Sequence, residues 1–172
     1  MASLMEDLMT TLDMQINEYE TLLELSKKKT PIIVEGDIDK LTKITDEEQD
    51  VVDRIATLDA KRVEITKDIA NVINTDVESL KLSVLIGILE RRPAEQAKLS
   101  DIIDRLTSVV NDVKLINNNN RELINHSIEM VEFDLNLFKS MRQAPVTNNY
   151  GANGLGDGSI LGGTIGGFDA KQ

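Results

Sequence analysis

The sequence predicts an all-α protein: an elongated antiparallel helical bundle or coiled coil of three long helices and one short helix, followed by a flexible glycine-rich tail. Apolar residues recur at alternating spacings of three and four through most of residues 1–143, and no alternating strand pattern occurs. Aromatic residues make up only 3% of the 172 residues, so the core is aliphatic. Eight of the ten glycines lie between Gly151 and Gly167, a density that opposes a packed helix. We therefore predict a helical bundle domain over 1–143 and a flexible tail over 144–172.

The longest predicted helix covers residues 93–143 and starts at a proline, which suits the first turn of a helix. Its apolar seam steps by three and four, with one stutter. The seam consists of Leu99, Ile103, Leu106, Val110, Val113, Asn117, Asn120, Ile124, Ile128, Val131, Leu135 and Phe138. Asparagine at a seam position typically fixes register, and a functional polar groove is the alternative interpretation of Asn117 and Asn120. This helix would be roughly 75 Å long, and it is stable in water only if its apolar stripe packs against other apolar side chains.

The first predicted helix covers residues 4–29. Ser3 and Glu6 show the spacing of a capping box, in which the two side chains satisfy free N–H groups at a helix start. Three lysines at 27–29 fall in the last turn, where positive charge complements the helix dipole. Pro31 is expected to end this helix, because proline lacks an N–H and clashes with the preceding turn.

The second predicted helix covers residues 38–72, after a turn at Gly36 and with Asp37 as its N-cap. Its seam alternates three and four without a break, but Glu48 and Arg62 occupy two of the apolar positions. Polar residues at such positions usually fix register or lie at the seam edge, and a binding role is the alternative interpretation.

A short third helix is predicted over residues 76–91, with a second capping box at Thr75 and Glu78. This segment is apolar on most sides, so it is either buried on several faces or offered to a partner. Short connections favour antiparallel neighbours, so we expect an antiparallel bundle of the three long helices with the short helix across one end or part of the length. Because the helix at 93–143 is longer than the other two, part of its stripe is expected to be uncovered.

Composition excludes several classes of function. The chain has no cysteine, which excludes disulfides and thiolate chemistry, and its net charge of −11 opposes a nucleic-acid partner. The N-terminus does not resemble a secretory signal and no run of 18 apolar residues occurs, so we expect a cytoplasmic location without membrane insertion. His126 is the only histidine, and no catalytic constellation is recognisable. We therefore expect no enzymatic activity, no cofactor and no metal site.

The methionines lie only near the start of the first helix and near the end of the last one. In an antiparallel packing of these two helices the two ends would meet, and Phe133 and Phe138 would join them. Flexible methionine side chains suit the binding of a partner helix, although they also serve as loose core filling. The predicted site for a client helix comprises Met5, Met9, Leu12, Val131, Leu135, Phe138 and Met141.

Several short motifs, in order along nearly the whole chain, resemble the FlgN-type family of flagellar export chaperones. The entry to the second helix carries VEGDIDKL at 34–41, and its middle carries EQ at 48–49 and LDAKR at 58–62, where Asp59 stands in place of the usual glutamate. The last helix carries NNNNRELI at 117–124. The C-terminal region carries YGANG at 150–154 and DAK at 169–171, within a longer glycine-rich stretch than is usual for the family.

This resemblance implies a cytosolic chaperone of flagellar type III secretion. Members of the family bind the C-terminal amphipathic segment of the hook–filament junction proteins, hook-associated proteins one and three. They prevent premature self-association of these clients and deliver them to the export gate of the flagellar export apparatus. By the same resemblance, Tyr150 is expected to contribute to docking at the export gate. We expect a monomer or weak homo-oligomer, and the rival hypothesis is a self-associating structural coiled coil without an export client.

Overall fold

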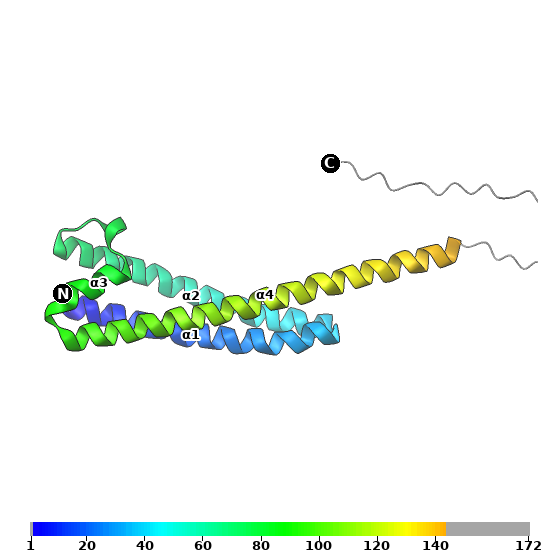
Figure 1. Ribbon diagram of the computed structural model, residues 1–172, viewed down its shortest axis with the longest axis horizontal. Coiled ribbons are helices and arrows are strands. Elements are labelled where there is room, and N and C mark those ends of the chain that lie inside the picture. Colours follow the sequence, from blue (N-terminus) through cyan, green and yellow to red (C-terminus); the bar gives the residue numbers. More distant parts are fainter. Residues whose placement is uncertain (1, 144–172) are drawn as a thin grey trace, which may run out of the picture.

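The computed structural model describes residues 2–143 and consists of helices joined by short turns (Figure 1). The elements are α1 (Ala2–Glu35), α2 (Ile38–Ile73), the 3₁₀ turn η1 (Val77–Ser79), α3 (Leu82–Ile88), the 3₁₀ turn η2 (Leu89–Arg91) and α4 (Pro93–Gln143). The predicted elongated all-α fold is confirmed, with three long helices and one short helix. The predicted flexible tail at 144–172 lies outside the described residues.

A tight turn joins α1 to α2 and makes them antiparallel (Figure 1). Gly36 has a φ of +72°, a left-handed conformation that residues with a Cβ rarely adopt. Its N–H donates to the Ile32 carbonyl at 3.1 Å. Asp37 is the N-cap of α2, as predicted, because its carboxylate accepts from the Lys40 N–H at 3.0 Å. This bond holds the pKa of the Asp37 carboxyl below its usual value.

Helix α1 is longer at both ends than predicted. It includes Ser3, so the predicted capping box at Ser3 is wrong, and it continues through Pro31 to Glu35. A proline inside a helix removes one backbone hydrogen bond, and burial of apolar side chains beyond it offsets that loss. Ile33, two residues after Pro31, is 4% exposed. The lysines at 27–29 therefore lie inside α1 and not in its last turn.

The predicted single helix at 76–91 is instead broken into η1, α3 and η2. Asn74 ends α2 in the left-handed conformation, and Asp76, rather than Thr75, caps η1 by accepting from the Glu78 N–H at 3.3 Å. Leu80, Leu85 and Leu89 are buried in the core. The alternative that this segment is buried, rather than offered to a partner, is therefore confirmed for these three residues.

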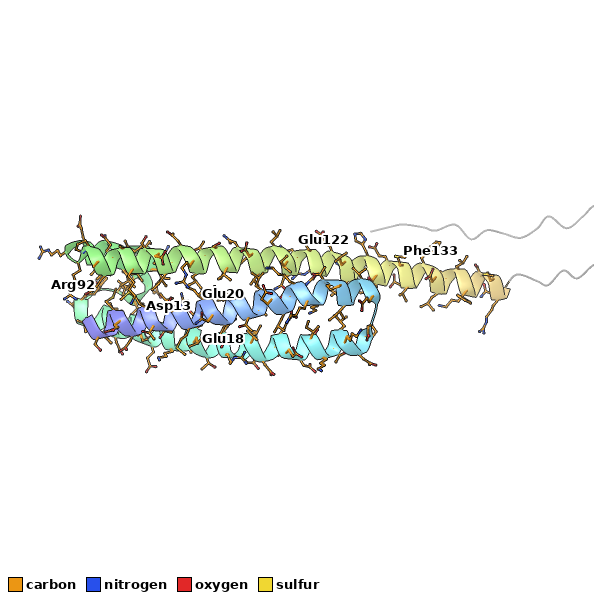
Figure 2. All side chains as sticks on the ribbon, turned by 90° about the horizontal axis from the view of Figure 1, so that it is seen from below. Asp13, Glu18, Glu20, Arg92, Glu122 and Phe133 are labelled. Atoms are coloured by element: carbon orange, nitrogen blue, oxygen red, sulfur yellow. The ribbon has the colours of Figure 1, made fainter. Side chains whose placement is uncertain are left out.

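Helix α1 lies between α2 and α4 (Figure 2). Near the N-terminus of α1, its apolar face packs against α2, the α3 segment and the start of α4 in one core cluster. The buried members of this cluster are Met5, Leu8, Met9, Leu12, Ile16, Ile65, Ile69, Ala70, Leu80, Leu85, Leu89, Leu99 and Ile102. A smaller cluster further along contains Leu22, Val51, Ile55 and Val113.

Helices α1 and α4 run parallel to each other, which corrects the predicted antiparallel packing of this pair. Two cross-helix contacts fix the direction: Asp13 pairs with Arg105 at 3.3 Å, and further along both helices the Ser26 carbonyl accepts from Asn120 at 2.9 Å. The reason is the α3 segment, which returns the chain to α4 at the end where α2 finishes (Figure 1). Helix α4 is therefore antiparallel to α2 and starts beside the start of α1.

Candidate functional site

The C-terminal part of α4 extends beyond the turn that joins α1 to α2 (Figures 1 and 2). Every residue from 125 to 143 is exposed, whereas Leu123 and Ile124 are the last half-buried residues of the helix. We call residues 125–143 the α4 overhang. At 1.5 Å per residue its length is about 28 Å. The prediction that part of the α4 stripe is uncovered is confirmed.

The overhang concentrates exposed apolar side chains. It carries eight of the 16 large apolar residues that are exposed among the described residues, with exposed fractions between 48% and 69%. These residues are Ile128, Met130, Val131, Phe133, Leu135, Leu137, Phe138 and Met141. Single exposed apolar residues are normal on a protein surface, but a contiguous set on one isolated helix is typical of an interaction surface.

The eight residues form two stripes along the helix, because residues three or four apart share a face. The seam stripe continues the heptad seam of α4 and consists of Ile128, Val131, Leu135 and Phe138. The second stripe consists of Met130, Phe133, Leu137 and Met141. Asp134 and Ser127 separate the stripes on one side, and a wide polar face separates them on the other. Each stripe presents apolar side chains at the three- and four-residue spacing by which one amphipathic helix contacts another.

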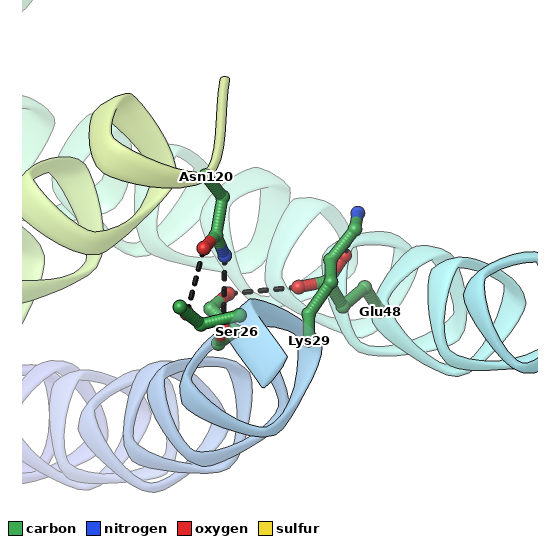
Figure 3. Close-up of polar contacts among 5 residues, drawn as sticks. Ser26, Lys29, Glu48 and Asn120 are labelled. Atoms are coloured by element: carbon green, nitrogen blue, oxygen red, sulfur yellow. Dashed lines mark hydrogen bonds and ion pairs between the residues drawn. The ribbon is translucent and has the colours of Figure 1, made fainter. Parts of the chain in front are cut away.

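A half-buried polar layer crosses the three long helices just before the overhang begins (Figure 3). Asn120 is only 4% exposed, and its Nδ2 donates to the Ser26 carbonyl at 2.9 Å while its Oδ1 accepts from the Thr30 hydroxyl at 2.7 Å. The Ser26 hydroxyl donates to Glu48 at 2.8 Å, and Lys29 donates to the other Glu48 oxygen at 2.7 Å. This set of contacts links α1 to α2 and α4 in one network.

The polar layer fixes the axial position of α4 against α1. A shift of α4 along α1 would leave the buried Asn120 amide without partners, which is costly in an apolar interior. The register interpretation of Asn120 and Glu48 is therefore supported by their contacts. Asn117, in contrast, is exposed and outside this network. Because the layer fixes the register, it also fixes how much of α4 projects as the overhang.

Arg62 has a mostly local contact. Its guanidinium donates to Asp59 of the same helix at 2.6 Å, and the side chain is 31% exposed. The buried Arg62 Nε has no hydrogen-bond partner among the described residues. The side chain lies at the edge of the α2 seam beside the α3 segment, where it lines a hollow with Lys81. This position agrees with the seam-edge interpretation.

The structure separates the residues of the predicted client site into two groups. Met5, Met9 and Leu12 are 2%, 5% and 0% exposed and belong to the core at the start of α1. Val131, Leu135, Phe138 and Met141 are exposed on the overhang. The prediction that these two ends meet is wrong, because α1 and α4 are parallel and the overhang leaves the bundle at the opposite end (Figure 1). Tyr150 lies outside the described residues.

Ile128 and Leu137 are additional exposed residues that the predicted site did not include, and Met130 and Phe133 were associated with it only through the assumed meeting of the helix ends. Heptad spacing alone identifies Ile128, since it is part of the seam. The second stripe had no comparable signal, because its residues fall at positions that a two-faced helix pattern assigns to solvent.

The remaining features of residues 2–143 concern metal ligands, membrane-spanning helices and the histidine at 126. No group of three or more potential metal ligands occurs in this part of the chain. None of the helices described is both long and apolar enough to cross a membrane. His126 is exposed on the overhang, and its Nδ1 lies 3.6 Å from Glu129.

Comparison with known proteins identifies the family of this chain. The sequence profile of the family described as FlgN protein matches residues 1–156. The chain is 25% identical over 162 residues to the flagella synthesis protein FlgN of Proteus mirabilis, a match that covers 93% of this chain and 97% of that relative. No solved structure matches the chain. Because the profile covers most of the 172 residues, the chain belongs to the FlgN protein family.

Proposed function

We propose that this protein is a cytoplasmic flagellar export chaperone whose α4 overhang binds the C-terminal amphipathic segment of hook-associated proteins one and three. Membership of the FlgN family and the name of the Proteus mirabilis relative, a flagella synthesis protein, support a role in the flagellum. The observation that carries the client site is the overhang itself, a helix of about 28 Å with eight exposed apolar residues.

The physical fit is that of one amphipathic helix on another. An export client must stay unfolded and unassembled, so its apolar helix needs a temporary cover. The seam stripe offers Ile128, Val131, Leu135 and Phe138 at the spacing that a partner helix contacts. The flexible side chains of Met130 and Met141 adapt to partners of different shape. Three of the predicted client-site residues on α4 belong to the seam stripe, and the fourth, Met141, belongs to the second stripe.

Delivery of the client to the export gate is the second part of this proposal. The overhang leads directly into residues 144–172, so a client on the overhang would lie next to Tyr150 along the chain. We assign gate docking to Tyr150 on the family resemblance alone. The expected effect of Tyr150→Ala is normal client binding with loss of export, measured by calorimetry and by secretion of the client in cells.

Calorimetric titration with the C-terminal segments of the two hook-associated proteins tests client binding. We expect saturable binding with a negative heat-capacity change, the mark of apolar burial. The double variant Leu135→Asp/Phe138→Asp should abolish binding and keep the helix content of the body. Leu115→Asp is the matched control, because Leu115 is 60% exposed on the same helix but lies outside the overhang. Normal binding by the double variant would refute the overhang as the client site.

A structural coiled coil without a client is the second candidate function, and the heptad seam of the overhang favours it. It requires a stable oligomer in which no exposed stripe is left for a client. Sedimentation of the free protein together with the titration separates the two functions. A stable oligomer that binds neither client segment would support the structural role.

A further inference from the structure

A hollow lies between α2 and the α3 segment, at the end of the bundle opposite the overhang (Figure 1). Its volume is about 520 Å³, which is within the range of sites that hold a small ligand or a few residues of a peptide. Arg62 of α2 and Lys81, the residue before α3, are the two charged side chains that line it. We call this site the Arg62 hollow. Its residues take no part in the proposed client site.

The uncharged lining of the Arg62 hollow is mostly apolar. Two hydroxyl side chains accompany an apolar wall that consists of Val63, Val77, Leu80 and Leu82. Leu80 belongs to the core, whereas Val63 is 42% exposed. An exposed apolar wall in a hollow of this size is stabilised by contact with an apolar side chain of a ligand.

The charge of the hollow is opposite to that of the whole chain. The net charge of the protein is −11, yet among the described residues no aspartate or glutamate lines the hollow. Lys81 is exposed and takes part in no ion pair within residues 2–143. Its ammonium group is therefore available to a carboxylate of another molecule.

Arg62 has hydrogen-bond donors that its own chain does not use. Its Nη2 donates to Asp59 at 2.6 Å, whereas its buried Nε has no partner among the described residues. An unpaired buried N–H is costly, and a carboxylate binds arginine best through two parallel N–H donors. The Asp59 side chain is 50% exposed, so its ion pair contributes little to stability. A rotation of the Arg62 side chain toward the hollow would present Nε and a terminal nitrogen to one ligand carboxylate.

We propose that the Arg62 hollow binds an acidic, apolar segment of a partner protein. One carboxylate of the segment binds Arg62, a second carboxylate meets Lys81, and an apolar side chain between them contacts the wall at Val63. Charge complementarity selects this partner, because both cations would repel a basic segment. A neutral apolar segment would leave the Arg62 Nε unpaired, and a free inorganic anion would leave the apolar wall uncovered.

The position of the hollow has a consequence for the proposed function. Because the hollow and the overhang lie at opposite ends of the molecule, a client on the overhang would not obstruct the hollow (Figure 1). The chaperone would therefore hold a client and a second, acidic partner at the same time. Only this consequence rests on the proposed function, since binding to the hollow can be measured without a client.

Fluorescence anisotropy of a labelled peptide, titrated with the full chain at low salt, tests the proposal. The probe is an acetylated and amidated octapeptide of sequence LDELLDEL, and the reference peptide LNQLLNQL carries amides in place of the carboxylates. We expect saturable binding of the acidic peptide with a dissociation constant below about 1 mM, and about tenfold weaker binding of the reference peptide. Since the whole chain is acidic, general electrostatic attraction does not produce this preference.

Variants of the hollow should weaken binding of the acidic peptide. We expect a loss of about tenfold for Arg62→Gln and about threefold for the more exposed Lys81→Gln. Val63→Ser should cost about threefold through lost apolar contact. The matched controls are Lys43→Gln, at an exposed lysine of α2, and Val52→Ser, at a valine of α2 that is 41% exposed. Neither control residue lines the hollow, so both variants should bind as the wild type does.

Circular dichroism establishes that each variant is folded. Lys81 is exposed, so Lys81→Gln keeps the test valid even if Arg62→Gln unfolds the protein. A lack of saturable binding by the acidic peptide would overturn the proposal, and so would equal binding of the two peptides. Folded Arg62→Gln and Lys81→Gln variants with the affinity of the wild type would also overturn it. Displacement of the probe by inorganic phosphate as effectively as by unlabelled peptide would indicate a simple anion site and would refute the peptide assignment.

Discussion

Asn120 of α4 donates its side-chain N–H to the backbone carbonyl of Ser26 in α1, at 2.9 Å and nearly out of contact with solvent. This bond joins residues 94 positions apart in the sequence. It lies one turn before the last half-buried residues of α4, so it marks the place where the helix leaves the bundle. Four predictions test how the body of the protein supports the overhang.

Asn120→Ala should lower the free energy of unfolding by about 1–3 kcal/mol, because it leaves the Thr30 hydroxyl and the Ser26 carbonyl with fewer partners in a buried layer. Urea denaturation followed by circular dichroism measures the change. Asn117→Ala is the matched control, since Asn117 is exposed on the same helix, and should have little effect. Equal effects of the two variants would refute a special role for Asn120.

Glu48→Gln should destabilise the bundle by roughly 1–3 kcal/mol, because Lys29 would remain half-buried without its carboxylate partner. Thermal and urea unfolding both report this loss. Glu47→Gln changes the neighbouring, exposed glutamate and serves as the control. Replacing both partners, as in Lys29→Met/Glu48→Leu, should recover most of the stability. A double variant less stable than Glu48→Gln would contradict this explanation.

Leu12→Ala should cost about 2–5 kcal/mol of stability, because Leu12 is fully buried in the core and its loss leaves a cavity. Met14→Ala, at a position 47% exposed on the same helix, should be close to neutral. Client affinity of folded Leu12→Ala should equal that of the wild type. A variant with normal stability and weakened client binding would instead support the original assignment of Leu12 to the client site.

Pro31→Ala should raise the free energy of unfolding by about 1–3 kcal/mol, since alanine restores the backbone N–H that a residue inside α1 donates to the preceding turn. Pro31 is exposed, so the change removes little packing. Urea denaturation measures this change in the free energy of unfolding. An unchanged stability would indicate that α1 ends before residue 31, as its sequence predicts.

Much of the fold follows from local sequence patterns. The three–four periodicity predicts the long helices, and the Gly36 turn with the Asp37 cap predicts the start of α2 at Ile38. Helix ends were less predictable where tertiary contacts outweigh local preference. Pro31 and the broken segment at 74–92 are the two examples, because burial of Ile33 and of Leu80, Leu85 and Leu89 decides their conformation.

The candidate site was predictable only in part. Residue spacing shows that the apolar stripe of α4 is longer than the other two long helices that would cover it. This is enough to expect an exposed apolar surface near Leu135. It does not show which end of α1 lies beside that surface, because periodicity is the same for parallel and antiparallel neighbours. The direction of α4 depends on the path of the α3 segment, which is why the sequence predicts the wrong location for Met5, Met9 and Leu12.

The placement of the overhang outside the bundle has an evolutionary consequence. Its side chains do not contribute to the core, so substitutions there leave the packing of the bundle intact. Residues such as Phe133 and Leu137 are therefore free to diverge as partners diverge, while Asn120 and the residues around it are constrained by the packing of the body. Related proteins should accordingly differ most in the α4 overhang, the part that we propose binds clients.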